Sequence, residues 1–509
     1  MKDKWTKVNN GTDIRGIVIK DDKEITLTDD MVYIISSAFA KWLSLNKNIS
    51  CEKLKVGVGM DSRITGLDFK KASINGLSKM GCSVFDCGMC STPAMFMTTV
   101  MDEYKFDGSI ELTASHLPYY YNGIKFFTDK GAMEKENILE IIDIARDIEK
   151  ESKYNSNNDT RSVKKIEFMD SYSRHLRNKI SEGTGSLGEN DKPLSGLKII
   201  VDAGNGVGGF YVDKVLKPLG ADTQGSQFIE PDGYFPNHIP NPEKKEAMDS
   251  IKNAVIKSNA DLGIIFDADV DRAAIVDENG KEINRNRLIA LISSIVLKEH
   301  PHSIVVTDSV TSTGLKEFIE GLGGVHKRFK RGYKNVIDEG LRLNKCGKKC
   351  CLAIETSGHA ALKENYFLDD GAYLVSKLII NMVKLKRDDN KKLSSLIENL
   401  KEPVESMEFR LKIEKESFKE YGNEVIDKLK DFISDKKGWS VEPVNYEGIR
   451  INCDKNSGNG WFLLRLSLHE PVLPLNIESD SENGVELIKN ELIPFFKLFD
   501  CLKIDSILE

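Results

Sequence analysis

Three aspartates at alternate positions are the strongest chemical signal in the chain. Asp267, Asp269 and Asp271 lie in the segment GIIFDADVDRAAIV. In an extended strand, alternate carboxylates point to one side and repel one another unless a cation lies among them. A set of oxygen ligands favours a hard divalent ion, Mg²⁺ or Ca²⁺. Arg272 follows directly, which indicates that the metal and a phosphate group share this site.

The same segment has two other interpretations. An acidic turn between two strands would need no metal and remains the alternative. A calcium-binding EF-hand loop would place Glu278 at its twelfth position, but the sixth position is Arg272 rather than glycine. Because the flanking residues favour strands and not helices, we reject the calcium loop.

A second group of polar residues lies in LTASHLPYYYNGIKFF. Ser115 and His116 stand in a polar turn after an apolar segment, and Lys125 lies where another strand begins. A serine in a turn is by itself most typical of a cap or turn hydroxyl. A Ser–His–Asp triad is conceivable, but the side chains of adjacent residues seldom face one another and no nucleophile elbow surrounds Ser115.

A glycine-rich turn indicates a competing function. GNGVGG places Gly204, Gly206 and Gly209 directly after the apolar segment LKIIVDA and before a predicted helix. This is the context of a dinucleotide-binding fingerprint, with Glu230 as a candidate ribose ligand, so an NAD(P)-dependent oxidoreductase is the alternative from another class. The structural interpretation is a tight turn in which glycines let backbones pack closely. The local sequence does not separate the two.

Two further groups carry weaker signals. The segment IETSGHAAL offers Glu355, Ser357 and His359 in a glycine-containing loop, and these three side-chain types suit the adjacent hydroxyls of a sugar. Three cysteines within residues 82–90 have a spacing found in ferredoxin cluster sites. Because Cys82 opens a predicted buried strand, we interpret these cysteines as packing residues.

Composition limits the class of protein that could hold these groups. The 509 residues include 72 Lys and Arg against 79 Asp and Glu, a formal net charge of −7, so we expect neither a nucleic-acid nor a membrane partner. No apolar run approaches the about 18 residues that a membrane helix needs, and the N-terminus lacks the apolar region of a signal peptide. Nine cysteines, an odd number spread along the chain, favour a reducing compartment, the cytoplasm.

The elements that must position these residues form a unit that occurs three times. Each copy has an apolar strand ending in Asp, a small-residue loop, a helix closed by glycine, and a second strand. The copies begin at Leu54, Leu197 and Ser303. Helices are also predicted over residues 168–180 and 283–300, and strands alternate around a glycine-rich turn beyond about residue 403. We predict three α/β domains, 1–188, 189–300 and 301–404, and an α+β domain, 405–509.

Taken together and in this order, the segments resemble the α-D-phosphohexomutases, the family of phosphoglucomutase and phosphomannomutase. The resemblance spans nearly the whole chain and begins at NGTDIRG, where Arg15 matches a catalytic arginine. It continues through VGMDSR, TASHLPYYYNGIK, PDGYFPNHIPNPE, DADVDR and ETSGH. It implies four domains around a central cleft, three of them related α/β units with mixed sheets and the last α+β. It also favours packing as the role of the glycine-rich turn, since this family binds no dinucleotide there.

The resemblance also implies a function. A phosphohexomutase interconverts hexose 1-phosphate and hexose 6-phosphate, of glucose or mannose, through a phosphoserine enzyme and a hexose 1,6-bisphosphate that also serves as activator. Phosphoglucosamine mutase is the alternative within the family. The implied site comprises a metal set for one Mg²⁺, Ser115, Asp267, Asp269 and Asp271; catalytic Ser115, Arg15, Lys125, Arg272 and His359; and substrate-binding Lys334, Glu355, Ser357, Arg465, Ser467 and Glu470. We expect a monomer or homodimer.

Two loops depart from the family pattern. RLSLHEP keeps Arg465 and Ser467, but His469 stands where threonine is usual, and Pro474 replaces a basic residue. Leu117 stands where asparagine is usual in the serine-containing loop. We therefore expect the contacts with the distal phosphate to differ, and the choice between glucose, mannose and glucosamine phosphates stays open.

Overall fold

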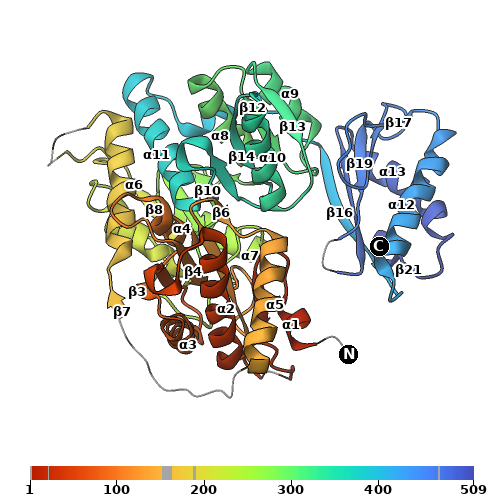
Figure 1. Ribbon diagram of the computed structural model, residues 1–509. Coiled ribbons are helices and arrows are strands. Elements are labelled where there is room, and N and C mark those ends of the chain that lie inside the picture. Colours follow the sequence, from red (N-terminus) through yellow and green to blue (C-terminus); the bar gives the residue numbers. More distant parts are fainter. Residues whose placement is uncertain are drawn as a thin grey trace. The chain divides into compact units, whose positions relative to one another are not determined.

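The chain divides into two compact units, and Figure 1 labels their helices and strands. The computed structural model describes residues 3–20, 22–151, 163–186, 188, 191–467 and 470–508, so His469 lies outside the described residues. Unit 1 comprises Met1–Asn284 and Ser357–Ser394, and unit 2 comprises Arg285–Thr356 and Ser395–Glu509. Among the described residues, no helix is both long and apolar enough to cross a membrane.

The first sheet of unit 1 contains the first predicted repeat. Its strands are β1 (Ile14–Ile17), β2 (Lys55–Met60), β3 (Ser83–Met89), β4 (Gly108–Leu112), β5 (Tyr121–Thr128), β6 (Gly131–Ala132) and β7 (Val163–Lys165). The order is β1-β5-β4-β2-β3-β7, with β6 beside β5. The sheet is mixed, because β2 runs parallel to β3 and β4 whereas β5 is antiparallel to β4 and β1. The carboxyl ends of β2 and β4 therefore lie at one edge, where the loops that follow them meet.

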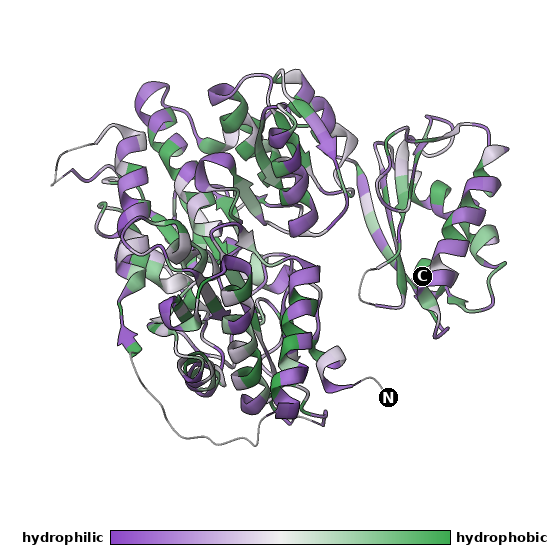
Figure 2. Cartoon of the chain, viewed as in Figure 1, coloured by the Kyte–Doolittle hydropathy of each residue, from purple (hydrophilic) through white to green (hydrophobic). Residues whose placement is uncertain are grey.

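Six helices accompany this sheet among the described residues: α1 (Lys4–Val8), α2 (Asp29–Lys47), α3 (Gly66–Lys79), α4 (Thr92–Val100), α5 (Lys135–Glu151) and α6 (Phe168–Thr184). α2 packs against α3 and α5, and α4 packs against β2, β4 and β5. The side chain of Ser91 caps the N-terminus of α4, where Pro93 suits the first turn. Figure 2 shows hydrophobic residues gathered on the strands and mixed faces on the helices, as a buried sheet with a helical cover requires.

The second sheet of unit 1 has the order β11-β10-β9-β8. Its strands are β8 (Ile199–Asp202), β9 (Leu262–Phe266), β10 (Ala273–Asp277) and β11 (Glu282–Ile283), with η2 (Val207–Gly209), η3 (Tyr211–Leu216) and α7 (Lys245–Ser258) between them. β8 is parallel to β9, and β9 is antiparallel to β10. The returning segment of unit 1 carries β15 (Ala360–Leu362) and α11 (Gly371–Asp388), and α11 packs against α6 and β10.

The second predicted repeat is only partly confirmed. Its first strand is β8, but its helix is the short π-type η3. The expected second strand over residues 221–229 is wrong, since the segment forms only single bridges, at Asp222 and Gln227. The physical reason is turn chemistry, since Gly225 has a φ of 112°. The backbone N of Gln224 donates to Oδ1 of Asp222, and the Ser226 hydroxyl donates to the carbonyl of Thr223.

The first part of unit 2 confirms the third repeat. Its parallel strands are β12 (Ile304–Thr307), β13 (Val325–Arg328) and β14 (Cys350–Ile354), with β12 between the other two. The helices are α8 (Arg285–Glu299), α9 (Thr313–Gly321) and α10 (Tyr333–Lys345). The predicted segment 189–300 would assign α8 to the second domain, whereas α8 packs against α9 and β14 in unit 2.

The rest of unit 2 has a sheet of order β17-β18-β19-β20-β16-β21. Its strands are β16 (Glu405–Ile413), β17 (Trp439–Val441), β18 (Ile449–Cys453), β19 (Gly460–Leu464), β20 (Val472–Ser479) and β21 (Leu502–Lys503), and its helices are α12 (Phe418–Ser434), α13 (Gly484–Phe496) and α14 (Asp505–Leu508). Strands and helices share one apolar core. This confirms the predicted α+β character of the C-terminal region.

Candidate active site

The three aspartates lie in the tight loop between β9 and β10. Because β9 ends at Phe266 and β10 begins at Ala273, the expectation that the aspartates alternate along an extended strand is wrong. Two antiparallel strands need a reversal of the chain, and Val270 provides it with a φ of 65°. The loop still gathers the three carboxylates, since one oxygen of each lies within 4.8 Å of the others.

The carboxylate cluster fits a divalent metal ion. Oδ1 of Asp269 and Oδ1 of Asp271 are buried and have no hydrogen-bond donor among the described residues. Burial and the neighbouring Asp271 raise the pKa of Asp267 well above its usual range. Buried carboxylate oxygens without donors are costly unless a cation binds them, and three oxygen donors suit a hard ion.

Ser115 lies directly beside this cluster. Its Oγ is 3.1 Å from Oδ2 of Asp267 and accepts a hydrogen bond from Nη2 of Arg272 at 3.2 Å. The side chain is almost fully buried, and the φ of 51° is uncommon for a residue other than glycine. The hydroxyl is therefore held in one place by the loop and not by a regular element.

The structure also places His116 against the serine. Nδ1 of His116 is 3.3 Å from Oγ of Ser115, so the expectation that these adjacent side chains do not face one another is wrong. The left-handed backbone of Ser115 breaks the alternation that would separate neighbours in a strand. Burial, with the charges of Arg272 and Arg15, lowers the pKa of His116 well below its usual range, so the imidazole is neutral near pH 7.

Arg63 holds the serine loop, although it is not among the candidate residues that the sequence indicates. Its Nη1 donates to the carbonyls of Pro118 and Tyr121 at 3.0 and 2.7 Å. Its Nη2 donates to the carbonyls of Ser115 and Leu117. Its Nε lies 3.2 Å from Asp61, and both side chains are fully buried. The only sequence signal was its place in the DSR segment after β2.

Arg15 and Lys125 come from adjacent strands, since Arg15 of β1 pairs with Gly123 of β5. Nε and Nη2 of Arg15 donate to Oδ2 of Asp13 at 2.9 and 2.7 Å, and Nη1 donates to the carbonyl of Ala114. Nζ of Lys125 lies 2.8 Å from Oδ2 of Asp269 and 2.6 Å from Oδ2 of Asp271. Both predicted cations thus belong to the cluster around Ser115.

Arg272 is fixed by its own loop and by the segment PDGYFPNHIPNPE. Its backbone N and its Nε donate to Asp267 at 3.1 and 2.9 Å. Its Nη1 donates to Oδ1 of Asn241 at 3.4 Å. The same segment packs on the chain next to Arg63, because a Cβ at Gly233 would lie 2.5 Å from the carbonyl oxygen of Ser62. The segment therefore contacts Arg272 directly and packs against the backbone next to Arg63.

His359 and Ser357, from the predicted sugar-recognition loop, also belong to unit 1. Nε2 of His359 is 3.5 Å from Oδ1 of Asp271, and Nδ1 is 2.9 Å from Oγ of Ser357. Burial lowers the pKa of His359 to about 3, although Asp271 opposes this shift. The imidazole of His359 therefore lies uncharged beside the carboxylates near pH 7.

Glu355 and Lys334 lie in unit 2. Oε1 of Glu355 accepts a hydrogen bond from the backbone N of Gly332 at 2.5 Å, just before α10 begins. Nζ of Lys334 pairs with Asp338 one turn further along α10. The loop that contains Glu355 thus meets the N-terminus of α10, where anions are favoured.

Arg465, Ser467 and Glu470 follow β19 in unit 2. Arg465 is buried, and its Nε has no hydrogen-bond acceptor within the described part of the chain. The backbone N of Glu470 donates to Oγ of Ser467 at 3.4 Å, and the carboxylate of Glu470 pairs with Arg410. The carboxylate of Glu470 is therefore already paired with Arg410 of β16.

The sequence did not point to two further residues beside Arg465. Burial lowers the pKa of Arg465, and the positive charge of Arg331 lowers it further. Glu447 accepts hydrogen bonds from the backbone N of Arg331 at 2.8 Å and from the Ser309 hydroxyl. Two guanidinium groups whose charges act on one another favour an anion such as phosphate. No local pattern could have found them, since more than a hundred residues separate the partners.

The glycine-rich turn packs against protein. A Cβ at Gly206 would lie 2.5 Å from the carbonyl oxygen of Ala268, and one at Gly209 would lie 2.1 Å from that of Ile229. The backbone N of Val207 donates to Ala268 at 2.9 Å. The space that a dinucleotide would need is filled, and the turn supports the loop of the three aspartates.

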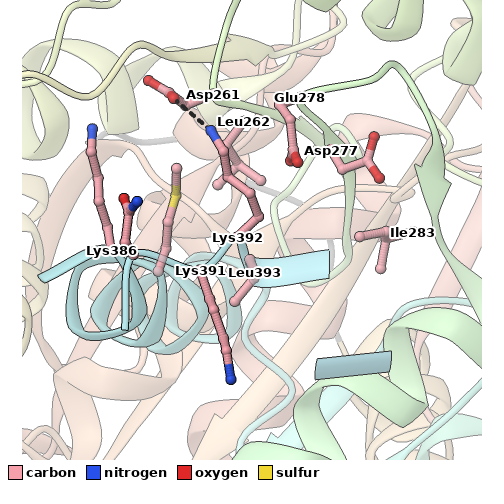
Figure 3. Close-up of a pocket in the computed structure, with 11 residues that line it drawn as sticks. Asp261, Leu262, Asp277, Glu278, Ile283, Lys386, Lys391, Lys392 and Leu393 are labelled. Carbon is pink, nitrogen blue, oxygen red and sulfur yellow. Dashed lines mark ion pairs between the residues drawn. The ribbon is translucent and has the colours of Figure 1, made fainter. Parts of the chain in front are cut away.

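Unit 1 has a separate hollow between the end of α11 and the sheet strands β9 and β10 (Figure 3). Asp261, Glu278, Lys386 and Lys392 are among its lining residues, and none of the predicted site residues lines it. Lys392 lies 3.6 Å from Asp261, so two of its charges compensate one another.

Comparison with known proteins extends the resemblance. Three family models match, described as phosphoglucomutase/phosphomannomutase alpha/beta/alpha domains I, II and III, over residues 6–154, 170–280 and 284–404. A phosphoglucomutase of Neisseria gonorrhoeae is 30% identical over 94% of both chains. A phosphomannomutase/phosphoglucomutase of Pseudomonas aeruginosa is 30% identical over 94% of this chain and 92% of that one. A family protein from Burkholderia thailandensis has a solved structure with a TM-score of 0.78 at 26% identity, covering 98% of each chain.

The fold and the matched sequences define an isomerase that transfers a phosphoryl group within a hexose phosphate. The chain belongs to the phosphoglucomutase/phosphomannomutase family. The predicted family and fold class are confirmed, with three α/β domains and a further sheet-rich C-terminal domain. The family uses a metal ion, and the acidic cluster can bind one.

Proposed function

We propose that the chain interconverts hexose 1-phosphate and hexose 6-phosphate, of glucose or mannose, with Ser115 as the phosphoryl carrier. The observation that carries this proposal is the position of Oγ of Ser115, 3.1 Å from Asp267 and 3.2 Å from Arg272. Asp267, Asp269 and Asp271 would hold one Mg²⁺. When bound, this ion would neutralise charge on the phosphoryl group and orient it for in-line transfer.

The cations around Ser115 suit the charge that develops during transfer. Arg272 already donates to the serine oxygen, and Arg15 donates to the carbonyl of the preceding residue, Ala114. Donors that are fixed before the reaction stabilise developing charge without reorganisation. We assign this role to Arg15, Lys125 and Arg272, and we assign to Arg63 the positioning of the loop.

A proton must leave the sugar hydroxyl when it attacks and return in the reverse step. His359 is one candidate for this acid/base role, because its Nε2 lies 3.5 Å from Asp271 in the cluster beside Ser115. Lys125 is the other candidate for acid/base duty. As an ammonium group among the same carboxylates it can donate the proton that returns to the sugar oxygen, and it can accept one only after it has lost a proton. The two differ in charge, so the pH dependence of turnover would separate them.

The remaining predicted residues suit substrate binding. We assign Glu355 and Ser357 to the sugar hydroxyls, and Arg465 and Ser467 to the phosphate that is not transferred. Lys334 and Glu470 are assigned to substrate binding. The bisphosphate intermediate must turn end over end, so these contacts must serve two orientations. Arg331 strengthens the anion-binding assignment of Arg465, because two guanidinium groups attract a phosphate more than one does. We place the enzyme in the cytoplasm as a monomer or homodimer.

A coupled assay tests this function. Glucose 1-phosphate, mannose 1-phosphate and glucosamine 1-phosphate are compared in Mg²⁺ with a trace of hexose 1,6-bisphosphate as activator. We expect turnover of the glucose or mannose substrate and a loss of several orders of magnitude in S115A. Turnover of glucosamine 1-phosphate alone would favour the phosphoglucosamine mutase alternative. Turnover of none of the three, or normal turnover in S115A, would contradict the proposal.

A further inference from the structure

A buried glutamate that the proposed mechanism does not use lies beside the active site. Glu111 of β4 is fully buried, and neither of its carboxyl oxygens has a hydrogen-bond partner among the residues that the structure describes. Burial, with the charges of Asp61 and Asp269, raises the pKa of Glu111 well above its usual range. A buried polar group without a partner weakens a fold, so its presence calls for a functional reason.

The sheet places Glu111 between a glycine and the catalytic lysine. Glu111 is directly opposite Gly59 of β2 and directly opposite Lys125 of β5. Residues that face one another on neighbouring strands project to the same side of a sheet. Gly59 makes room for the carboxyl group, because a Cβ there would lie 2.6 Å from Oε2 of Glu111 and 2.6 Å from Sδ of Met95. Glu111 is therefore buried against Gly59, on the side of the sheet to which Lys125 also projects.

Lys125 is engaged with groups that the metal must also use. Its Nζ donates to Asp269 at 2.8 Å and to Asp271 at 2.6 Å. A divalent ion held by the same carboxylates repels the ammonium group, and burial makes this repulsion strong. Metal binding therefore requires Lys125 to weaken at least one of these contacts. Glu111 is directly opposite Lys125 in the sheet, and its side chain projects to the same face.

We propose that Glu111 is a positioning residue. When a divalent ion binds the aspartates, a carboxyl oxygen of Glu111 accepts a hydrogen bond from the ammonium group of Lys125. The inference rests on the proposed function, since it needs the metal site. In one arrangement Lys125 contacts Asp269 and Asp271, and in the other it contacts Glu111. Glu111 thereby lowers the competition between lysine and metal and keeps the lysine beside Ser115 for phosphoryl transfer.

A double-mutant cycle on metal affinity tests the proposal. Binding of Mg²⁺ to the full chain is measured by titration calorimetry for the wild type, E111M, K125M and E111M/K125M. We expect E111M to weaken Mg²⁺ binding about tenfold, the size of a typical coupling between contacting residues. We expect K125M to tighten binding, and E111M to have no effect in the K125M background, because the competing ammonium is then absent.

Two controls separate positioning from a structural role. S109A changes another buried polar residue of β4, two positions away on the same face, whose hydroxyl donates to Met95; it should leave Mg²⁺ affinity unchanged. E111M should unfold thermally at or above the wild-type temperature without metal, because an apolar side chain replaces an unpartnered carboxyl.

Each other outcome is decisive. Equal weakening by E111M with and without Lys125 would show a general charge or structural effect and overturn the proposal. Unchanged affinity in E111M would overturn it while leaving the metal site intact. If the wild type binds no Mg²⁺, the proposed metal site fails and the role of Glu111 fails with it.

Discussion

The stability of the loop that contains Ser115 should depend strongly on Arg63. The guanidinium group donates to four carbonyls of residues 115–121 and pairs with Asp61 at 3.2 Å, with both side chains fully buried. Breaking one side of a buried pair costs about 3–5 kcal/mol. In R63M we therefore expect the loop to lose about 3 kcal/mol or more of local stability. Turnover should fall steeply, because Ser115 loses the contact that fixes its backbone.

Hydrogen exchange measures this loss locally, which matters because the chain has several domains and no single unfolding transition is assured. A loss of about 3 kcal/mol speeds exchange of the amides in residues 113–123 about a hundredfold. R63K is the matched variant, since it keeps the charge beside Asp61 but cannot donate in a fork, and it should lie between wild type and R63M. Exchange in R63M within threefold of wild type, with normal turnover, would refute the role given to Arg63.

Three further predictions concern the surroundings of the cluster. D269N should raise the Mg²⁺ concentration needed for half-maximal turnover about tenfold or more, and an unchanged titration would argue against the metal loop. G206V should also weaken Mg²⁺ binding, because its Cβ would meet the carbonyl of Ala268; calorimetry checks this. Burial lowers the pKa of His238, but the hydrogen bond and charge of Asp202 outweigh burial, so the net pKa of His238 is above its usual value. The ion pair of His238 with Asp202 therefore stabilises unit 1 fully below about pH 6.5. This stabilisation is lost as the pH rises through the pKa of His238 in the folded state. H238N should remove that slope from thermal unfolding measured against pH, and an unchanged slope would exclude the pair as its source.

Much of the fold was predictable because it depends on local patterns. Apolar runs that end in Asp, followed by glycine-closed helices, identified β2, α3, β12 and α9 in the first and third repeats. The second repeat differed where turn residues outweighed the repeat pattern, around Gly225. The aspartate loop was located correctly but given the wrong geometry, because alternation in sequence does not distinguish a strand from a reversal.

The parts of the site that sequence could not give are contacts between distant segments. Glu447 and Arg331 are 116 positions apart, and nothing in NYEGIR or KRGYKN indicates the partner. In the sequence, Glu111 looks like an ordinary strand residue. The role proposed for it depends on the strand register, which places it opposite Lys125. Burial could not be predicted from the local sequence either. The pKa of His359 is set by the groups that surround its side chain in the fold, and these are not its neighbours in sequence.

The most direct test is to find the phosphoryl group itself. The protein is incubated with glucose 1,6-bisphosphate and Mg²⁺, digested, and analysed by mass spectrometry for the phosphorylated peptide. We expect the phosphate on Ser115. If this phosphate is isotopically labelled, we expect the label to pass into the hexose phosphates when excess unlabelled hexose 1-phosphate is added, while unlabelled phosphate replaces it on Ser115. Phosphate on another residue, or catalysis by a chain whose Ser115 is never phosphorylated, would contradict the central claim that this hydroxyl carries the transferred group.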